Sequence, residues 1–198
     1  RKMYFCRVKN TNGPEFLQLR MFPNDKRIHF DGIVHEAIFD MCGYEPVEFA
    51  SDFVIHHTGY ERRHVAMAKL ERNYKLLRNT ARTHVSLFAM ANTLVAMKMF
   101  EEAGSAFIET VGMLENNDIQ PDIHYAAIIG AAQCMLETGN RLEAVSYAER
   151  AVSLRPFDIR GWYFLGKSSN NIEAYRRGLQ CRNYLSSLQN FHEFYHVK

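Results

Sequence analysis

The sequence lacks any apolar run near the ~18–20 residues that a helix needs to span a bilayer, so we expect no transmembrane segment. It also lacks a strong charge of one sign, because 24 Lys and Arg residues stand against 22 Asp and Glu residues, for a formal net charge of +2. So small an excess gives no electrostatic reason to expect nucleic-acid binding. The 47% hydrophobic and 23% charged residues are an ordinary globular balance, which excludes a disordered chain.

Cysteine is sparse, and its four positions are scattered without a CxxC pair: Cys6, Cys42, Cys134 and Cys181. This spacing argues against a zinc ribbon or a redox motif and predicts reduced, mostly buried thiols in a cytoplasmic protein. A Gly-rich phosphate loop and a Ser-His-Asp or Cys-His nucleophile set are also missing. The chain starts on strand-like sequence without a signal-peptide pattern, and we expect that an upstream part of the protein precedes it.

The first 60 residues alternate apolar and polar side chains, which predicts short strands. Runs of this kind are MYFCRV, EFLQLRMF, RIHFDGIVHE and DFVIHHTGY. The turn cluster at residues 23–26 separates the second run from the third, so we expect these two to pair as an antiparallel hairpin. We expect the third run to end at the adjacent His35 and Glu36. All-apolar strands typical of a central parallel sheet are not visible.

From about Glu61 the apolar period becomes helical. Residues 61–82 carry seven basic and two acidic side chains. Two interpretations stay open: a solvated helix face, or a basic surface for phosphate or for an acidic acceptor.

Residues 83–198 predict a string of amphipathic helices that repeats. Two copies share small residues in a first helix, a polar or Gly break, and then a Glu-Ala pair that ends at Ala103 or Ala144. A third copy opens at Trp162, and we expect its last helix, about residues 173–190, to cap the stack. The pattern is typical of tetratricopeptide-like (TPR-like) repeats, although 41 residues separate Ala103 from Ala144 where the ideal period is about 34.

Four short motifs follow one another in the strand-rich half and in the basic helix. Their residues are Arg20 and Phe22, then Gly32, His35 and Glu36, then His57, Gly59 and Tyr60, and finally Lys69, Arg72, Asn73, Leu76 and Leu77. Followed by TPR-like helices, this ordered series resembles bacterial family 2 glycosyltransferases with a C-terminal TPR region. The resemblance covers most of the chain and depends on the order of motifs that are each weak alone.

The resemblance implies a GT-A fold, in which an upstream nucleotide-sugar half carries an Asp-x-Asp pair for Mg²⁺ or Mn²⁺. This sequence contains no Asp-x-Asp. We therefore expect an α+β fragment: residues 1–66 as the C-terminal end of a GT-A α/β domain, with a β-hairpin and short strands, and residues 67–198 as an all-α TPR-like domain.

The geometry of a strand limits which side chains in residues 27–39 share a site. Asp31 and His35 would lie on one face about 13 Å apart, too far for one metal ion. His29 and Asp31 could converge on a metal, or they form a solvated polar face. The resemblance implies that His35 completes the shell of a metal, and a neutral imidazole suits Mn²⁺ better than Mg²⁺.

The resemblance also assigns catalytic roles to Glu36 and Arg20. For Glu36, an acceptor contact, a contact that orients the metal ligand, and a structural salt bridge stay open. For Arg20, a contact to the diphosphate or the acceptor competes with a plain ion pair. We expect His57 to be structural.

Two functions are compatible with these observations. In the first, the chain is the C-terminal part of an inverting, metal-dependent glycosyltransferase that moves a sugar from a nucleotide-sugar donor to a protein, peptide or glycan acceptor. Its helices would hold the acceptor or pair two subunits. In the second, the chain is a non-catalytic TPR-like interaction scaffold.

Overall fold

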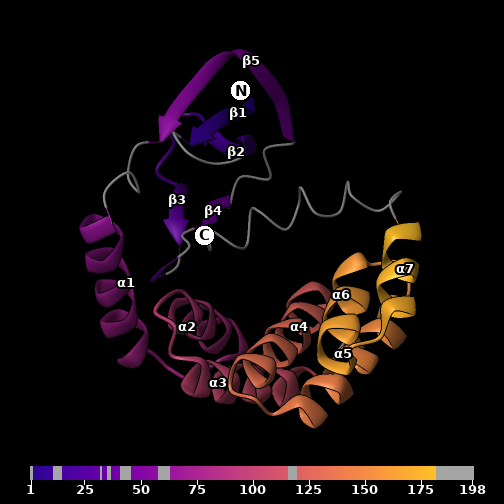
Figure 1. The fold of residues 1–198 in the computed structure, drawn as a ribbon. Helices are drawn as coiled ribbons and strands as arrows, with labels where there is room; N and C mark the ends of the chain where they lie inside the picture. The colour runs from indigo at the N-terminus through magenta and orange to yellow at the C-terminus, as the bar shows by residue number, and fades with distance from the viewer. Residues whose placement is uncertain are drawn as a thin grey trace. The chain divides into compact units, whose positions relative to one another are not determined.

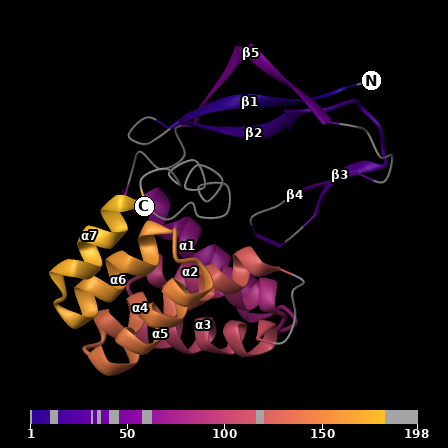
Figure 2. The ribbon, with the colours of Figure 1, turned by 90° about the vertical axis from the view of Figure 1, so that its right-hand side faces the viewer.

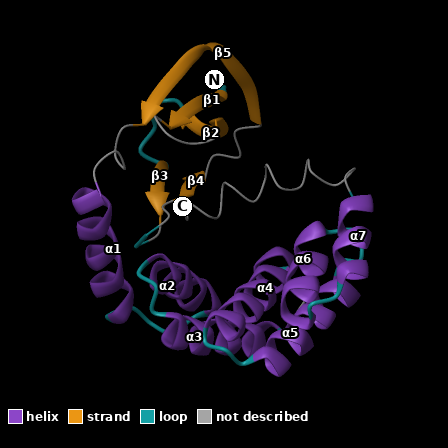
Figure 3. Cartoon of the chain, in the orientation of Figure 1, coloured by secondary structure: helices purple, strands orange, loops and turns teal. Residues whose placement is uncertain are grey.

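The computed structural model, drawn in Figure 1, describes residues 2–10, 15–31, 33–34, 37–40, 46–57, 63–115 and 120–181. Within these ranges the chain forms five β-strands followed by seven α-helices (Figure 3). The fold is α+β, as the sequence predicts. It divides into two compact units, one that ends at Arg72 and one that begins at Asn73, and this division falls inside helix α1. The domain boundary after residue 66 stays a prediction.

Three strands of the first unit form a mixed sheet (Figure 2). The central strand β1 (Met3–Asn10) pairs antiparallel with β2 (Glu15–Met21) and parallel with β5 (Pro46–His57). The parallel pairing brings together two segments that are far apart in the sequence, and the apolar pattern did not predict it.

The burial pattern of β1 departs from strict alternation, and its pairing with both neighbouring strands shifts in register. Met3, Cys6 and Val8 are buried. Strict alternation would place Met3 and Cys6 on opposite faces of the sheet. The register with both neighbouring strands shifts close to Tyr4, between Tyr4 and Phe5 on the β2 side. The extra residue at each shift lies on the neighbouring strand, Arg20 on β2 and Val47 on β5, so the bulges interrupt the partner strands and leave the chain of β1 without an inserted residue.

Strand β5 contains a larger irregularity. Its register against β1 jumps from Ala50 opposite Cys6 to Val54 opposite Arg7, so residues 51–53 have no partner on β1. Inserted residues bend a strand, and Figure 1 shows β5 changing direction along its length.

Strands β3 (Ile28–Asp31) and β4 (Ala37–Asp40) form a separate antiparallel pair. The sequence predicted that the run containing β2 would pair with the run containing β3, and that the latter would continue to His35. Both expectations are wrong: β2 pairs with β1, and β3 ends at Asp31 opposite Ala37. His35 and Glu36 lie outside the described residues.

The segment between β2 and β3 explains why these strands do not form a ladder. Pro23 has no N–H to donate, and its carbonyl accepts a hydrogen bond from the Asp25 N–H at 2.8 Å. The Asp25 carbonyl accepts from the Ile28 N–H at 2.9 Å, and the Asp25 carboxylate accepts from Arg27 Nη2 at 2.7 Å. These local bonds shape a wide turn in place of a tight hairpin.

The remaining chain is helical: α1 (Arg63–Arg78), α2 (His84–Ala96), α3 (Phe100–Leu114), α4 (Pro121–Glu137), α5 (Arg141–Leu154), α6 (Ile159–Ser169) and α7 (Ile172–Gln180). From α2 onward each helix packs on the next, and α4 also contacts α2 and α6 (Figure 1). Three helix pairs therefore stack in sequence order, which confirms the predicted helical architecture. Membership of the TPR-like class stays a prediction.

In the described part of the chain, no helix has both the length and the apolar character that crossing a membrane requires.

Helix α4 lies at the centre of the stack and is buried around its whole circumference over two turns. The buried residues are Tyr125, Ala126, Ala127, Ile128, Ile129, Gly130, Ala131 and Ala132. A helix that is apolar on every side has to be surrounded by other elements, and here α2, α3, α5 and α6 supply that surround.

The turn inside each helix pair passes through one residue with a left-handed backbone. These residues are Lys98 (φ 63°), Gly139 (φ 84°) and Asn170 (φ 54°). Each stands four or five residues before the buried alanine that opens the packing of the second helix: Ala103, Ala144 and Ala174. The shared turn geometry supports the prediction that the three pairs are copies of one unit.

Candidate functional site

Arg20 is the one predicted catalytic residue that lies among the described residues. It is exposed near the end of β2. Its Nε donates a hydrogen bond to Gln18 Oε1 at 3.1 Å, and its guanidinium carbon stands 5.7 Å from the centre of the Phe30 ring. The structure shows no carboxylate paired with Arg20 in the described ranges. Both interpretations of Arg20, a contact to the diphosphate or the acceptor and a plain ion pair, stay predictions.

The aromatic residues beside Arg20 tie the end of β2 to β3. The Phe22 and Phe30 rings meet edge to face, with centroids 5.8 Å apart and planes at 75°. Such pairs stabilise by about 0.5–1.5 kcal/mol beyond the area they bury. The stacked guanidinium and the two rings therefore form one cluster that fixes the direction of Arg20.

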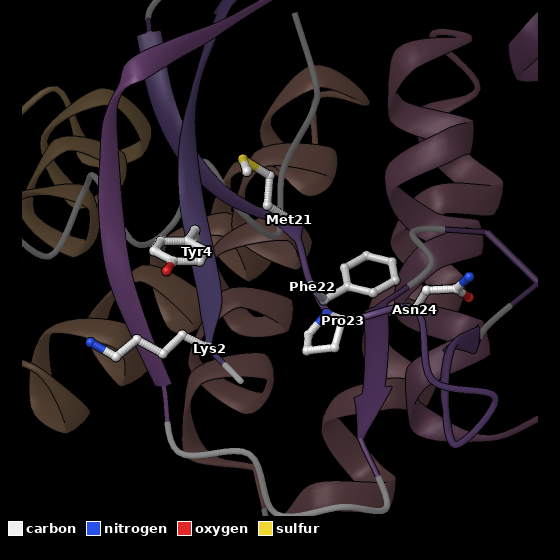
Figure 4. Close-up of a pocket in the computed structure, with 6 residues that line it drawn as sticks. All are labelled: Lys2, Tyr4, Met21, Phe22, Pro23 and Asn24. Atoms are coloured by element: carbon white, nitrogen blue, oxygen red, sulfur yellow. The ribbon is translucent and has the colours of Figure 1, made fainter.

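An open depression of about 450 Å³ lies next to this cluster (Figure 4). It is lined by Lys2, Tyr4, Met21, Phe22, Pro23 and Asn24. Tyr4 and Met21 are partners across the β1–β2 ladder, and Phe22 belongs both to the depression and to the aromatic cluster. Apolar walls with a few polar groups at the rim are typical of sites for small organic ligands.

The residues predicted to bind metal and acceptor are not placed. His35 and Glu36 lie outside the described residues, as do Gly59 and Tyr60 of the third motif. His29 is exposed on β3. In the described ranges, no three His, Cys, Asp or Glu side chains gather closely enough to hold a metal ion. The metal site therefore stays a prediction.

The described cysteines fit the prediction of reduced, mostly buried thiols. Cys6 and Cys134 are buried, Cys181 is half-buried, and all three are free. Burial, with Glu137 nearby, raises the pKa of the Cys134 thiol to about 12, so this sulfur stays protonated and unreactive at neutral pH. Cys42 lies outside the described residues.

A second polar cluster, which the sequence analysis missed, surrounds Tyr125 in the helical unit. Tyr125 is 1% exposed, and the guanidinium carbons of Arg155 and Arg160 lie 4.7 and 5.0 Å from its ring centre. Arg155 pairs with Asp122 at 2.5 Å, and Arg160 pairs with Asp158 through both carboxylate oxygens. The sequence feature that could have revealed this cluster is a tyrosine within a helix of small apolar residues.

The Tyr125 cluster is a structural junction between α4 and the start of α6. The Asp158 carboxylate also caps α6, because it accepts a hydrogen bond from the Arg160 N–H at 3.0 Å. Burial opposes its negative charge, but the hydrogen bonds and the charge of Arg160 outweigh burial and lower the pKa of Asp158. Burial, reinforced by Asp158, raises the pKa of Tyr125. Neither group is adjusted for proton transfer near neutral pH.

Comparison with known protein families and with curated proteins finds no match to this chain.

Proposed function

We propose that this chain supplies the acceptor-side strands and the helical partner-binding unit of an inverting, metal-dependent glycosyltransferase. The observation that carries the proposal is Arg20, an exposed guanidinium that is stacked on Phe30, has no carboxylate partner in the described ranges, and stands beside an open depression. The order of the four sequence motifs supports the same function.

The site suits a sugar substrate on chemical grounds. The rings of Tyr4 and Phe22 offer apolar surface to the face of a sugar ring, while Lys2 and Asn24 offer donors at the rim. The guanidinium of Arg20 can bind a phosphate or a carboxylate through two parallel hydrogen bonds. In this proposal His35 is a ligand of Mn²⁺ or Mg²⁺, and Glu36 contacts the acceptor. The metal would balance the charge of the donor diphosphate.

The test uses the complete polypeptide that carries this chain, with a panel of nucleotide sugars and Mn²⁺ or Mg²⁺. Arg20→Gln should lower kcat/KM about 100-fold, the usual cost of losing one charged contact in a transition state. It should leave the melting temperature within about 2 °C of the parent, because the side chain is exposed. Transfer within a few-fold of the parent would remove Arg20 from the site.

The helical stack favours a second candidate function, that of an interaction scaffold without catalysis. Among the described helices, the three pairs contact mainly their near neighbours in the sequence, an arrangement that produces extended binding surfaces. A complete polypeptide that transfers no sugar from any donor, yet binds a protein partner or forms a homodimer through the helical unit, would support the scaffold and reject the enzyme. Sedimentation analysis measures the homodimer directly.

A further inference from the structure

Helix α1 has an exposed face that the proposed function does not use. Exposed side chains recur at positions 67, 68, 71, 72, 75, 76 and 78. Leu70 and Tyr74 are half-buried, and Leu77 is fully buried, on the opposite side. This spacing follows the helical period, so the exposed residues lie on one continuous face of the helix.

The charge of this face is positive. It carries Arg72, Lys75 and Arg78 against a single acidic residue, Glu71. The Lys75 and Arg78 side chains form no ion pair or hydrogen bond within the part of the chain that the structure describes. Lys75 and Arg78 lie in the last turn, where cations offset the helix dipole, but Arg72 lies one turn earlier and gains little from that effect.

Apolar side chains are mixed with the cations on the same face. Met67 is 39% exposed and Leu76 is 43% exposed. Leu76 lies four residues after Arg72, and Met67 lies four residues before Glu71, so each apolar side chain neighbours a charged one on the helix surface. A partner that covers the cations would therefore also cover apolar surface.

We propose that this face of α1 binds an acidic, amphipathic segment of a protein partner. A compact anion such as phosphate would need cations that converge on one point, and here they are spaced along about 9 Å of helix. A nucleic acid would need a broader positive surface than a chain with a net charge of +2 provides. A lipid surface would need a continuous apolar face, which Glu71 and the three cations interrupt.

The contact should be weak and salt-sensitive, because exposed ion pairs are screened by ions. The probe is a synthetic amphipathic peptide of about three heptads that contains Leu, Ala and Glu, with a twin in which Gln replaces every Glu. We expect the Glu peptide to bind the complete chain, the Gln peptide to bind at least about tenfold more weakly, and binding to fall as NaCl is raised.

Variants locate the contact. The double substitution Lys75→Glu and Arg78→Glu should weaken binding of the Glu peptide about tenfold or more. The exposed Arg141 at the start of α5 gives a matched control, since Arg141→Glu makes the same kind of charge change on another helix and should leave binding unchanged. The milder pair Lys75→Gln and Arg78→Gln repeats the test if the double reversal alters the melting temperature.

Several results would overturn the proposal. These are failure of the Glu peptide to bind, equal binding of the two peptides, or undiminished binding by both double variants. Binding of inorganic phosphate or of phosphatidylserine vesicles in place of the peptide, with the same dependence on Lys75 and Arg78, would assign the face to a different ligand and reject a protein partner. None of these outcomes depends on sugar transfer, so this inference and the proposed function fail separately.

Discussion

The ring of Phe107 fills the space that a side chain at Gly130 would need. A Cβ atom built on Gly130 would lie 2.5 Å from two carbons of that ring, and Phe107 is itself buried. Phe107 is on α3 and Gly130 is on α4, so this contact sets how closely the first and second helix pairs approach. It is the tightest of the glycine contacts that the described residues show.

Gly130→Ala should therefore lower the free energy of unfolding by about 1–3 kcal/mol, because the added methyl group forces Phe107 out of its position. Urea denaturation measures the loss. Gly112→Ala is the matched control: Gly112 lies on α3 with no atom near a built Cβ, so there the substitution should stabilise by about 0.5–1 kcal/mol. Adding Phe107→Leu to Gly130→Ala should recover part of the lost free energy of unfolding. If the losses of the two single variants simply add in the double variant, the contact between Phe107 and Gly130 is contradicted.

The left-handed turn residues give a second pair of predictions with opposite signs. Lys98 adopts φ 63° at some cost, so Lys98→Gly should stabilise the helical unit by up to about 1 kcal/mol. Gly139 adopts φ 84° with open space around it, so Gly139→Ala should destabilise by about 1–2 kcal/mol through backbone strain alone. Thermal unfolding of both variants tests the pair, and a stabilised Gly139→Ala would show that the turn is not left-handed.

The two Asp–Arg pairs beside Tyr125 should differ in their contribution to stability because they differ in exposure. The side chain of Asp158 is 9% exposed and that of Asp122 is 69% exposed. Asp158→Ala should cost about 3 kcal/mol, since it removes the buried carboxylate that pairs with Arg160 and also removes the cap of α6. Asp122→Ala should cost less than about 1 kcal/mol. Equal losses in urea denaturation would show that burial does not govern these pairs.

His124 predicts a pH dependence. Burial lowers its pKa, Arg150 at 3.3 Å lowers it further, and Glu115 opposes them. Because the folded-state pKa lies below the ordinary 6.5, the unfolded chain binds the proton more readily. This contribution to stability is complete above a pH of about 6.5 and is lost as the pH falls through the folded-state pKa.

His124→Gln should accordingly flatten the decline in unfolding free energy between about pH 7 and pH 5. Above about pH 7.5 parent and variant should change in parallel, since His124 is neutral in both the folded and the unfolded states. The measurement is the urea midpoint of each protein across this range. A variant whose stability falls as steeply as that of the parent would contradict the assignment.

The helical half could be predicted from the sequence because the pattern that forms a helix lies among residues close together in the chain. The spacing of apolar residues around Ala103 and Ala144 follows the helical period, and the structure buries both. The turn of the third pair is one residue shorter, because Asn170 stands four residues before Ala174 where Lys98 and Gly139 stand five residues before Ala103 and Ala144. The helical spacing of apolar residues does not predict which side chains meet between helices, such as Phe107 and Gly130.

The strand half was predictable only in part because strand pairing is non-local. The runs around β1 and β2 were recognised, but alternation does not state which strand lies beside which. The parallel partner of β1 and the register jump before Val54 depend on contacts across more than 40 residues. The same holds for Arg20: the sequence singled it out through a resemblance, and only the fold shows Phe30 beneath its guanidinium.

The central position of α4 has a consequence for how the helical unit opens. Backbone amides between Tyr125 and Ala132 are enclosed on every side, so water reaches them only when neighbouring helix pairs separate. Their deuterium exchange should therefore report the global opening of the unit, while α7, which among the described helices packs mainly on α6, should exchange through local fraying. The protection of backbone amides against exchange should fall from the middle of the stack toward its ends. The exchange rate of the α4 amides then gives the longest time for which the unit stays closed.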